Sequence, residues 1–361
     1  MKRSIILCVV FAFLLTSITL FGGGAKEPAS SQTTATITIK YSDSDPPGGV
    51  RTEFLKNVWI PAVERETKGA VKIQDFWGGA LLSAPESLKG ISDGVAQMGF
   101  VFAEFYPKQL PLHQIFKLFP RGPGKWEVIR WVYDTAYQQV PELRKEIEES
   151  WNLKIMLYTS GLPGAFASTK PITKIEDIRG QKWRASSRWV LEYLRNAGAI
   201  PVSVPWADVY MALQTRTIDG VLTNYDGLHM MKFEEPAPNL LVTKEIWWAT
   251  PFLVVANKTF WNSLPKEVQA GIEKANKFAM DEFGKAFTGA WDKIYEAEKK
   301  AGYKVAVISE ADLVKWENEG ELKKLHAKWV EENKAAGIGN ADQIMARMQT
   351  LMKEAMERDK K

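Results

Sequence analysis

The sequence is poor in the side chains on which metal and redox chemistry usually depend. Its 361 residues include one cysteine and three histidines. One cysteine forms no disulfide within the chain and supports neither a cysteine-based zinc module nor an iron–sulfur cluster. His113, His229 and His326 lack the spacing of a metal-ligand motif. We therefore expect no metal, no cofactor and ordinary structural roles for the three histidines.

Motifs that mark common enzyme classes are missing as well. The sequence has no G-x-x-x-x-G-K-[ST] phosphate loop, no H-E-x-x-H, no G-x-S-x-G turn and no G-x-G-x-x-G turn. No pair of carboxylates stands out, as a glycoside hydrolase would require. The residue inventory therefore favours a binding protein over an enzyme.

The charges are nearly balanced, with 47 lysines and arginines against 43 aspartates and glutamates. No basic block stands apart from the acids, which argues against a nucleic-acid-binding protein. Hydrophobic residues make up 45% of the chain, which excludes a disordered protein and suits one or two folded domains. Aromatic residues are plentiful and include 14 tryptophans.

The first 25 residues have the layout of a secretory signal peptide. Lys2 and Arg3 precede an apolar run over residues 5–21, and small residues follow at 22–25. We expect cleavage near position 25, a flexible leader over residues 26–36 and a periplasmic location. The alternative is a retained membrane anchor, because about 17 apolar residues lie at the short limit for spanning a bilayer.

Strands and helices alternate along the rest of the chain. The hydrophobic pattern predicts strands at residues 37–41, 71–76, 98–102, 153–158, 181–184, 201–204 and 218–222. Helices are expected around residues 54–69, 88–94, 189–197 and 207–215. This alternation indicates an α/β fold with mainly parallel sheets, in which ligands bind at the carboxyl ends of the strands.

A much longer helix is predicted from Pro265 to Ala301. Apolar and small residues recur there at helical spacing, and about 35 residues at a rise of 1.5 Å give roughly 50 Å. The small residues do not form the heptad repeat of a coiled coil. We expect one long helix running along two lobes, bent near Gly284 or Gly289, and a helical tail beyond Asp312.

The most informative stretch is Gly180-Gln-Lys-Trp-Arg184, which places an arginine at the end of a short strand. A guanidinium at that position can hold a carboxylate through two parallel charged hydrogen bonds. The alternative is a structural ion pair.

Three motifs in order carry a family resemblance. They are E-D-I-R-G-Q-K-W-R from position 176, G-A-x-P-V-x-V-P-x-x-D-V-Y-x-A-L-Q from position 198, and I-D-G from position 218. The sequence resembles the DctP-type substrate-binding proteins of TRAP (tripartite ATP-independent periplasmic) transporters. The resemblance implies a two-lobed periplasmic-binding-protein fold of the α/β class, with hinged lobes and a long helix spanning both. We expect lobe I over residues 37–160 plus 250–290 and lobe II over residues 161–249 plus 291–361.

The resemblance also implies where the ligand binds. Arg184 matches the arginine that clamps the ligand carboxylate. The family usually supplies an asparagine to the same carboxylate from D-G-x-E-N. Here the segment reads Asp219-Gly-Val-Leu-Thr-Asn224, so Thr223 holds the usual position and Asn224 follows one later. Successive strand residues face opposite ways, which leaves both as candidates.

Further candidates for the cleft lining are aromatic or acidic, and core packing is the alternative role for each. They are Trp206 and Tyr210 around the start of the helix at 207–215, Phe102, Glu104 and Tyr106 in the first lobe's pocket strand and loop, and Trp247 in the return between lobes.

These features predict a solute-binding protein without catalytic activity. Because aromatic residues are plentiful and no second pocket arginine is obvious, we expect a small organic acid with an apolar or aromatic body. The resemblance implies delivery of this acid to a TRAP permease in the membrane, and we expect a monomer. The alternatives are a secreted two-lobed enzyme, such as a carbohydrate hydrolase, and an exported ligand-sensing subunit.

Overall fold

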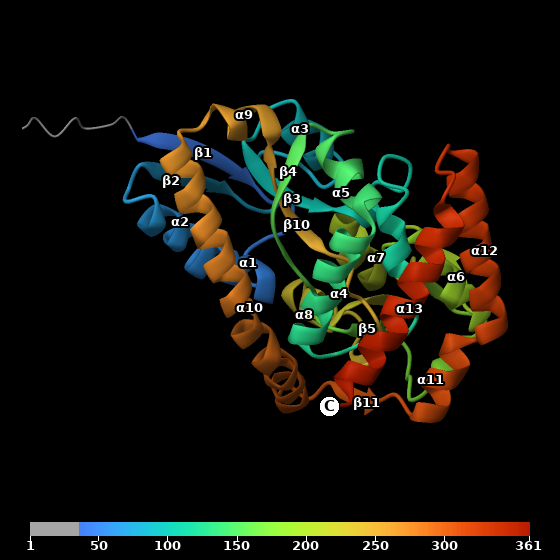
Figure 1. Cartoon of the computed structure of the whole chain (residues 1–361). Coiled ribbons are helices and arrows are strands. Elements are labelled where there is room, and N and C mark those ends of the chain that lie inside the picture. Colours follow the sequence, from blue (N-terminus) through green and yellow to red (C-terminus); the bar gives the residue numbers. More distant parts are fainter. Residues whose placement is uncertain (1–35) are drawn as a thin grey trace, which may run out of the picture. The chain divides into compact units, whose positions relative to one another are not determined.

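The computed structural model describes residues 36–361, which contain two β-sheets and the helices that cover them (Figure 1). The first sheet has the strand order β2-β1-β3-β10-β4. Its strands are β1 (Ile37–Ser42), β2 (Val71–Phe76), β3 (Met98–Phe102), β4 (Leu153–Thr159) and β10 (Phe252–Asn257). β1 pairs in parallel with β2 and β3, whereas β10 runs antiparallel to both β3 and β4.

The second sheet has the strand order β11-β9-β5-β8-β6-β7. Its strands are β5 (Gly164–Ser168), β6 (Lys182–Arg184), β7 (Ile200–Val202), β8 (Gly220–Asn224), β9 (Asn239–Val242) and β11 (Lys304–Val307). β6 is parallel to β7 and β8, and β9 is parallel to β11. β5 runs antiparallel to β8 and β9.

The expected α/β fold is therefore confirmed, with one strand in each sheet running against the others. These two strands, β5 and β10, are buried along their whole length. A short buried strand lacks the alternation of a half-buried one and is hard to distinguish from other apolar segments. The sequence pattern predicted neither β5 nor β10, and it also omitted β9 and β11. The strand expected at residues 218–222 lies at 220–224, which places Thr223 and Asn224 at its carboxyl end.

The helices that precede residue 264 lie between these strands along the chain. α1 (Val50–Phe54) continues through a π-helical turn, η1 (Leu55–Trp59), into α2 (Ile60–Glu66). The others are α3 (Ser87–Ser92), α4 (Trp126–Gln139), α5 (Pro141–Glu148), α6 (Arg188–Asn196), α7 (Val209–Gln214), α8 (Tyr225–Met230) and α9 (Lys258–Ser263). Short 3-10 turns are η2 (Ala103–Phe105), η3 (His113–Lys117), η4 (Ile175–Ile178) and η5 (Trp206–Asp208).

The predicted long helix is α10, which runs without a break from Lys266 to Lys300 (Figure 1). It contacts α2 and β4 beside the first sheet and α8 and β11 beside the second. Its small residues allow close packing: a Cβ added at Gly284 would lie 2.8 Å from Cδ1 of Trp126. Gly284 therefore allows close contact with a neighbouring aromatic ring, and the bend expected near Gly284 or Gly289 stays a prediction.

The chain ends in three helices, α11 (Glu310–Glu317), α12 (Glu319–Ala335) and α13 (Ala341–Asp359), which confirms the helical tail. α13 packs against α4 and α12. No helix within residues 36–361 is long and apolar enough to cross a membrane. The predicted signal peptide, and the predicted leader except Thr36, lie outside the described residues.

Candidate functional site

The carboxyl ends of strands from both sheets border one cavity. Phe102 ends β3 and pairs in register with Phe252, the first residue of β10. From the second sheet, Arg184 ends β6, and Thr223 and Asn224 end β8. All five residues line a cavity that encloses about 520 Å³, including its opening to solvent. Ligands of α/β sheets bind at this edge, so the cavity is the candidate binding site.

Arg184 provides an uncompensated positive charge in this cavity. Its side chain is 2% exposed, and its Nε donates to the carbonyl of Val204 at 3.0 Å. Its Nη1 is buried without a hydrogen-bond partner, and no carboxylate within residues 36–361 forms an ion pair with it. Burial lowers the pKa of Arg184 to about 10, and nearby Glu104 offsets this partly. Because a guanidinium stays charged in proteins, its free N–H groups favour a bound anion.

Thr223 and Asn224 both border the cavity, and a chain of hydrogen bonds joins them. The Thr223 hydroxyl donates to Asn224 Oδ1 at 3.1 Å, and Asn224 Nδ2 donates to Asp226 Oδ1 at 2.8 Å. The backbone N–H of Leu162 donates to the same Asp226 oxygen. Both residues reach the cavity although strand neighbours alternate, because Asn224 is the last strand residue and precedes α8 directly. Contact of Thr223 or Asn224 with the ligand carboxylate stays a prediction.

Two glycines fix the position of the Asn224 side chain. A Cβ added at Gly161 would lie 2.8 Å from the Asn224 Cβ, and one added at Gly227 would lie 2.7 Å from its amide atoms. Real side chains do not approach so closely, so any larger residue at either position has to displace the amide. The close approach of backbone to Asn224 thus accounts for both glycines.

Aromatic rings form much of the remaining wall. Phe102 packs edge-on against Phe252, with ring centroids 4.9 Å apart, and Phe100 lies 5.7 Å from Phe252. The Trp206 ring centroid lies 5.4 Å from Cζ of Arg184. Trp248 also lines the cavity. Phe102 and Trp206 are thus predicted residues that line it, whereas Phe252 had no signal beyond its place in an apolar run.

A second arginine, Arg51, borders the cavity, but its charge is already neutralised. Both terminal nitrogens bind Asp43, with Nη2 at 2.9 Å from Oδ1, and Nη2 also contacts Asp45 at 2.6 Å. Its guanidinium lies 3.7 Å from the centre of the Phe100 ring. Sequence reasoning missed Arg51 because it lies in a short helix after a glycine-rich turn. Among the two cavity arginines, only Arg184 offers free charge.

Glu104 does not line this cavity, but it borders an adjoining pocket that shares Arg184, Ser186 and Trp206 with it. Its carboxylate forms an ion pair with Lys117 at 3.0 Å and accepts hydrogen bonds from Thr250 and Ser186. Ser186 itself borders the cavity. The chain turns into η2 after Phe102, so the alternation of the strand no longer predicts which side chains face the ligand. Glu104 follows β3 of the first sheet, and Ser186 follows β6 of the second sheet. The hydrogen bond between them therefore lets Glu104 orient the cavity residue Ser186.

Three other candidates lie elsewhere. The hydroxyl of Tyr106 donates to a backbone carbonyl in the 84–88 segment, and the hydroxyl of Tyr210 donates to Glu235 at the surface. The indole of Trp247 donates to a backbone carbonyl at 2.7 Å. None of the three lines the cavity, and each hydroxyl or indole group already has a partner within the protein.

The buried Lys117 predicts a pH dependence of stability. Burial lowers its pKa to about 8, and Glu104 offsets part of this shift. Between pH 8 and the ordinary lysine pKa of about 10.4, the unfolded chain holds a proton that the folded protein lacks, so this group makes folding more favourable as pH rises. Urea unfolding at pH 8 and at pH 10 measures the effect. From pH 8 to pH 10, the free energy of unfolding should rise more in the wild type than in the double variant Lys117→Met/Glu104→Gln. Equal changes in the two proteins would contradict the assignment.

Comparison with known proteins agrees with this geometry. Residues 42–333 match the family described as bacterial extracellular solute-binding protein, family 7 (DctP). The chain is 29% identical over 271 residues to the C4-dicarboxylate-binding periplasmic protein DctP of Rhodobacter capsulatus, covering 74% of this chain and 78% of that protein.

Solved structures share the fold. A TRAP solute-binding protein from a marine metagenome, specific for aromatic acid ligands, has a TM-score of 0.75 at 21% identity, covering 88% of this chain and 99% of the other. One from Desulfovibrio salexigens with bound orotic acid has a TM-score of 0.73 at 24% identity, covering 87% and 100%. The two-lobed fold is therefore confirmed, and so is the prediction of a binding protein over an enzyme. The chain belongs to the DctP family, the extracellular solute-binding proteins of TRAP transporters.

Proposed function

We propose that the protein binds a small monocarboxylate whose body is apolar or ring-shaped, with the carboxylate on Arg184. The observation that carries this proposal is the buried Nη1 of Arg184, which has no partner within residues 36–361. A carboxylate there replaces the lost hydration of the guanidinium and adds charge-assisted hydrogen bonds. Thr223 and Asn224 supply polar groups beside it.

The aromatic wall supports a ring-bearing ligand over a sugar acid. Phe100, Phe102, Phe252, Trp206 and Trp248 offer large apolar area and ring faces or edges for stacking. A polyhydroxylated ligand needs a hydrogen-bond partner for each buried hydroxyl, and this wall supplies few. The neighbour described as specific for aromatic acids supports the same class.

A dicarboxylate fits this cavity less well, although a relative is named for C4-dicarboxylates. Its second carboxylate would need a second free cation, and Arg51 is already bound by Asp43 and Asp45. Asp45 and Asp226 also border the cavity, and burial raises the pKa of both carboxyl groups. They favour a neutral hydroxyl or N–H donor at that end of the ligand rather than a second anion.

The family supports a proposal for where the protein works and where it delivers its ligand. We propose that residues 1–25 direct export and are removed, that the protein works in the periplasm, and that the ligand-bound form delivers the acid to TRAP membrane subunits. A sensing role with the same fold remains the second hypothesis, and copurification with permease or signalling subunits separates the two.

A thermal-shift screen of purified protein tests the ligand class. The panel contains aromatic monocarboxylates, pyroglutamate, orotate, C4-dicarboxylates and sugar acids. Because a ligand that binds only the folded state raises Tm, we expect the largest shifts from ring-bearing monocarboxylates, followed by calorimetric titration of the best compound. Shifts confined to dicarboxylates or sugar acids would contradict the proposed class. Mass spectrometry after long incubation should recover the acid unchanged.

A further inference from the structure

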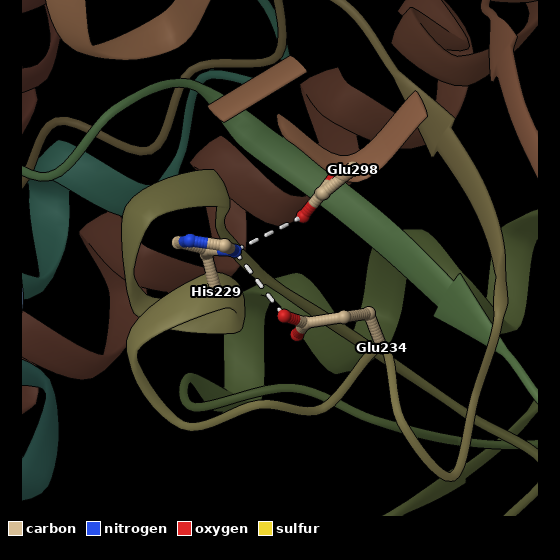
Figure 2. A group of neighbouring side chains, drawn as sticks. All are labelled: His229, Glu234 and Glu298. Carbon is tan, nitrogen blue, oxygen red and sulfur yellow. Dashed lines mark ion pairs between the residues drawn. The ribbon is translucent and has the colours of Figure 1, made fainter. Parts of the chain in front are cut away.

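We propose that His229, Glu234 and Glu298 bind a divalent transition-metal ion of the zinc type. His229 lies on α8, Glu234 lies in the segment after this helix, and Glu298 lies near the end of α10. Figure 2 shows the three side chains converging. One donor atom from each lies within 4.8 Å of the others.

The charges at this cluster call for a cation. Glu298 is 1% exposed and Glu234 is 4% exposed, so both carboxylates are removed from water. Within residues 36–361 no lysine or arginine forms an ion pair with either of them, and His229 is the ion-pair partner that they share. Two buried carboxylates without a full counter-charge are costly. A divalent ion neutralises both.

Each side chain keeps a buried polar atom that an ion can bind. Within residues 36–361, His229 Nδ1, Glu234 Oε2 and Glu298 Oε1 have no hydrogen-bond partner, although His229 Nδ1 lies at ion-pair distance from both carboxylates. The Tyr225 hydroxyl donates to the other oxygen of Glu298, Oε2, which orients the carboxylate and leaves Oε1 available. Such a supporting hydrogen bond is typical of metal-binding carboxylates.

The spacing also suits a metal. His229 Nδ1 lies 3.2 Å from Glu234 Oε1 and 3.6 Å from Glu298 Oε1. Metal–ligand bonds of about 2.0–2.2 Å in a tetrahedral arrangement place neighbouring donors roughly 3.4 Å apart.

The donor set indicates which metal. Imidazole nitrogen and carboxylate oxygen are both donor types that zinc binds, and three protein donors leave a fourth position for water. Calcium and magnesium prefer ligands that are all oxygen. His229 is partly exposed and borders a groove along α10, which gives the ion a path from solvent. Sequence spacing missed the cluster because the fold alone brings Glu298 beside His229.

The cluster is separate from the acid-binding cavity, since none of its three residues lines that cavity. The metal proposal therefore stands or falls independently of the proposed ligand.

Calorimetric titration tests the proposed metal site. Protein without an affinity tag is dialysed against a chelator, then against buffer, and titrated with ZnCl2. We expect one saturable site per chain with a micromolar or lower Kd, at least about tenfold weaker in Glu234→Gln and lost in His229→Ala. The matched control is Glu235→Gln, the neighbouring residue, whose carboxylate accepts from Tyr210 at the surface and which should bind like the wild type.

A spectroscopic measurement complements the titration. Co²⁺ added to the wild type should give the visible absorption of a low-coordinate site, and His229→Ala should not. Because the His229 side chain is partly exposed, we expect His229→Ala to fold normally, and circular dichroism verifies this. Absence of saturable binding to the wild type would overturn the proposal. Equal affinity in Glu234→Gln and Glu235→Gln would do the same.

Discussion

Arg184→Ala should lose about 2–5 kcal/mol of ligand binding, the range for truncating one partner of a buried hydrogen-bonded charge pair. This corresponds to a Kd increase of roughly 30- to 4,000-fold, measured by calorimetry with the best acid from the ligand screen. The expected loss is large because Arg51, the other cavity arginine, is bound by Asp43 and cannot replace the missing charge. Arg195→Ala is the matched control, since Arg195 pairs with Glu192 at the surface of α6, the helix that follows Arg184.

The stability of the ligand-free variant separates a binding role from a structural one. Arg184 has no ion-pair partner within residues 36–361, so Arg184→Met removes a buried charge without exposing a counter-charge. We expect the ligand-free Tm to stay the same or rise, while the ligand-induced rise disappears. A strongly destabilised variant that still binds the acid with wild-type affinity would refute the clamp.

Asp43→Ala should destabilise the folded protein by about 3–5 kcal/mol, because it leaves Arg51 buried with much of its charge uncompensated. Both side chains are almost fully buried, at 3% and 0% exposure. Asp43 also accepts hydrogen bonds from the Tyr41 hydroxyl at 2.7 Å and the Asp45 backbone at 3.0 Å. Asp45 alone remains to neutralise Arg51, and it is the more exposed of the two acids.

Urea unfolding of Asp43→Ala and Asp93→Ala measures this difference. Asp93 pairs with Lys89, and both side chains are more than half exposed, so its replacement should cost at most about 1 kcal/mol. Similar losses in the two variants would show that the Arg51–Asp43 pair contributes no more than a surface pair.

The sequence predicted the features that depend on local pattern. The strand that ends at Arg184, the helix after it and the 35-residue helix α10 all carry their signal in the periodicity of their own residues. The motif around Arg184 also supplied the family, and with it the fold. Arg184 therefore emerged as the leading candidate without any knowledge of its neighbours.

What the sequence missed depends on contacts between distant residues. Phe252 borders the cavity because β10 inserts beside β3, which no local pattern indicates. Trp247 and Trp248 lie in a segment outside strands and helices, where neither period 2 nor period 3.6 tells which ring faces the cavity. The neutralised charge of Arg51 likewise requires Asp43 and Asp45 to be placed beside it in space.

The position of β10 has a consequence for how the chain folds during synthesis. β10 pairs with β3 on one side and β4 on the other, although it follows both by many residues along the chain. Until residue 257 has left the ribosome, β3 and β4 have no partner between them and present open edges. Closing such distant pairings is slow, since loop-closure entropy is lost before the contacts form. The first sheet therefore stays incomplete until late in the synthesis of the chain, and its closure waits for a strand that lies more than 90 residues beyond β4.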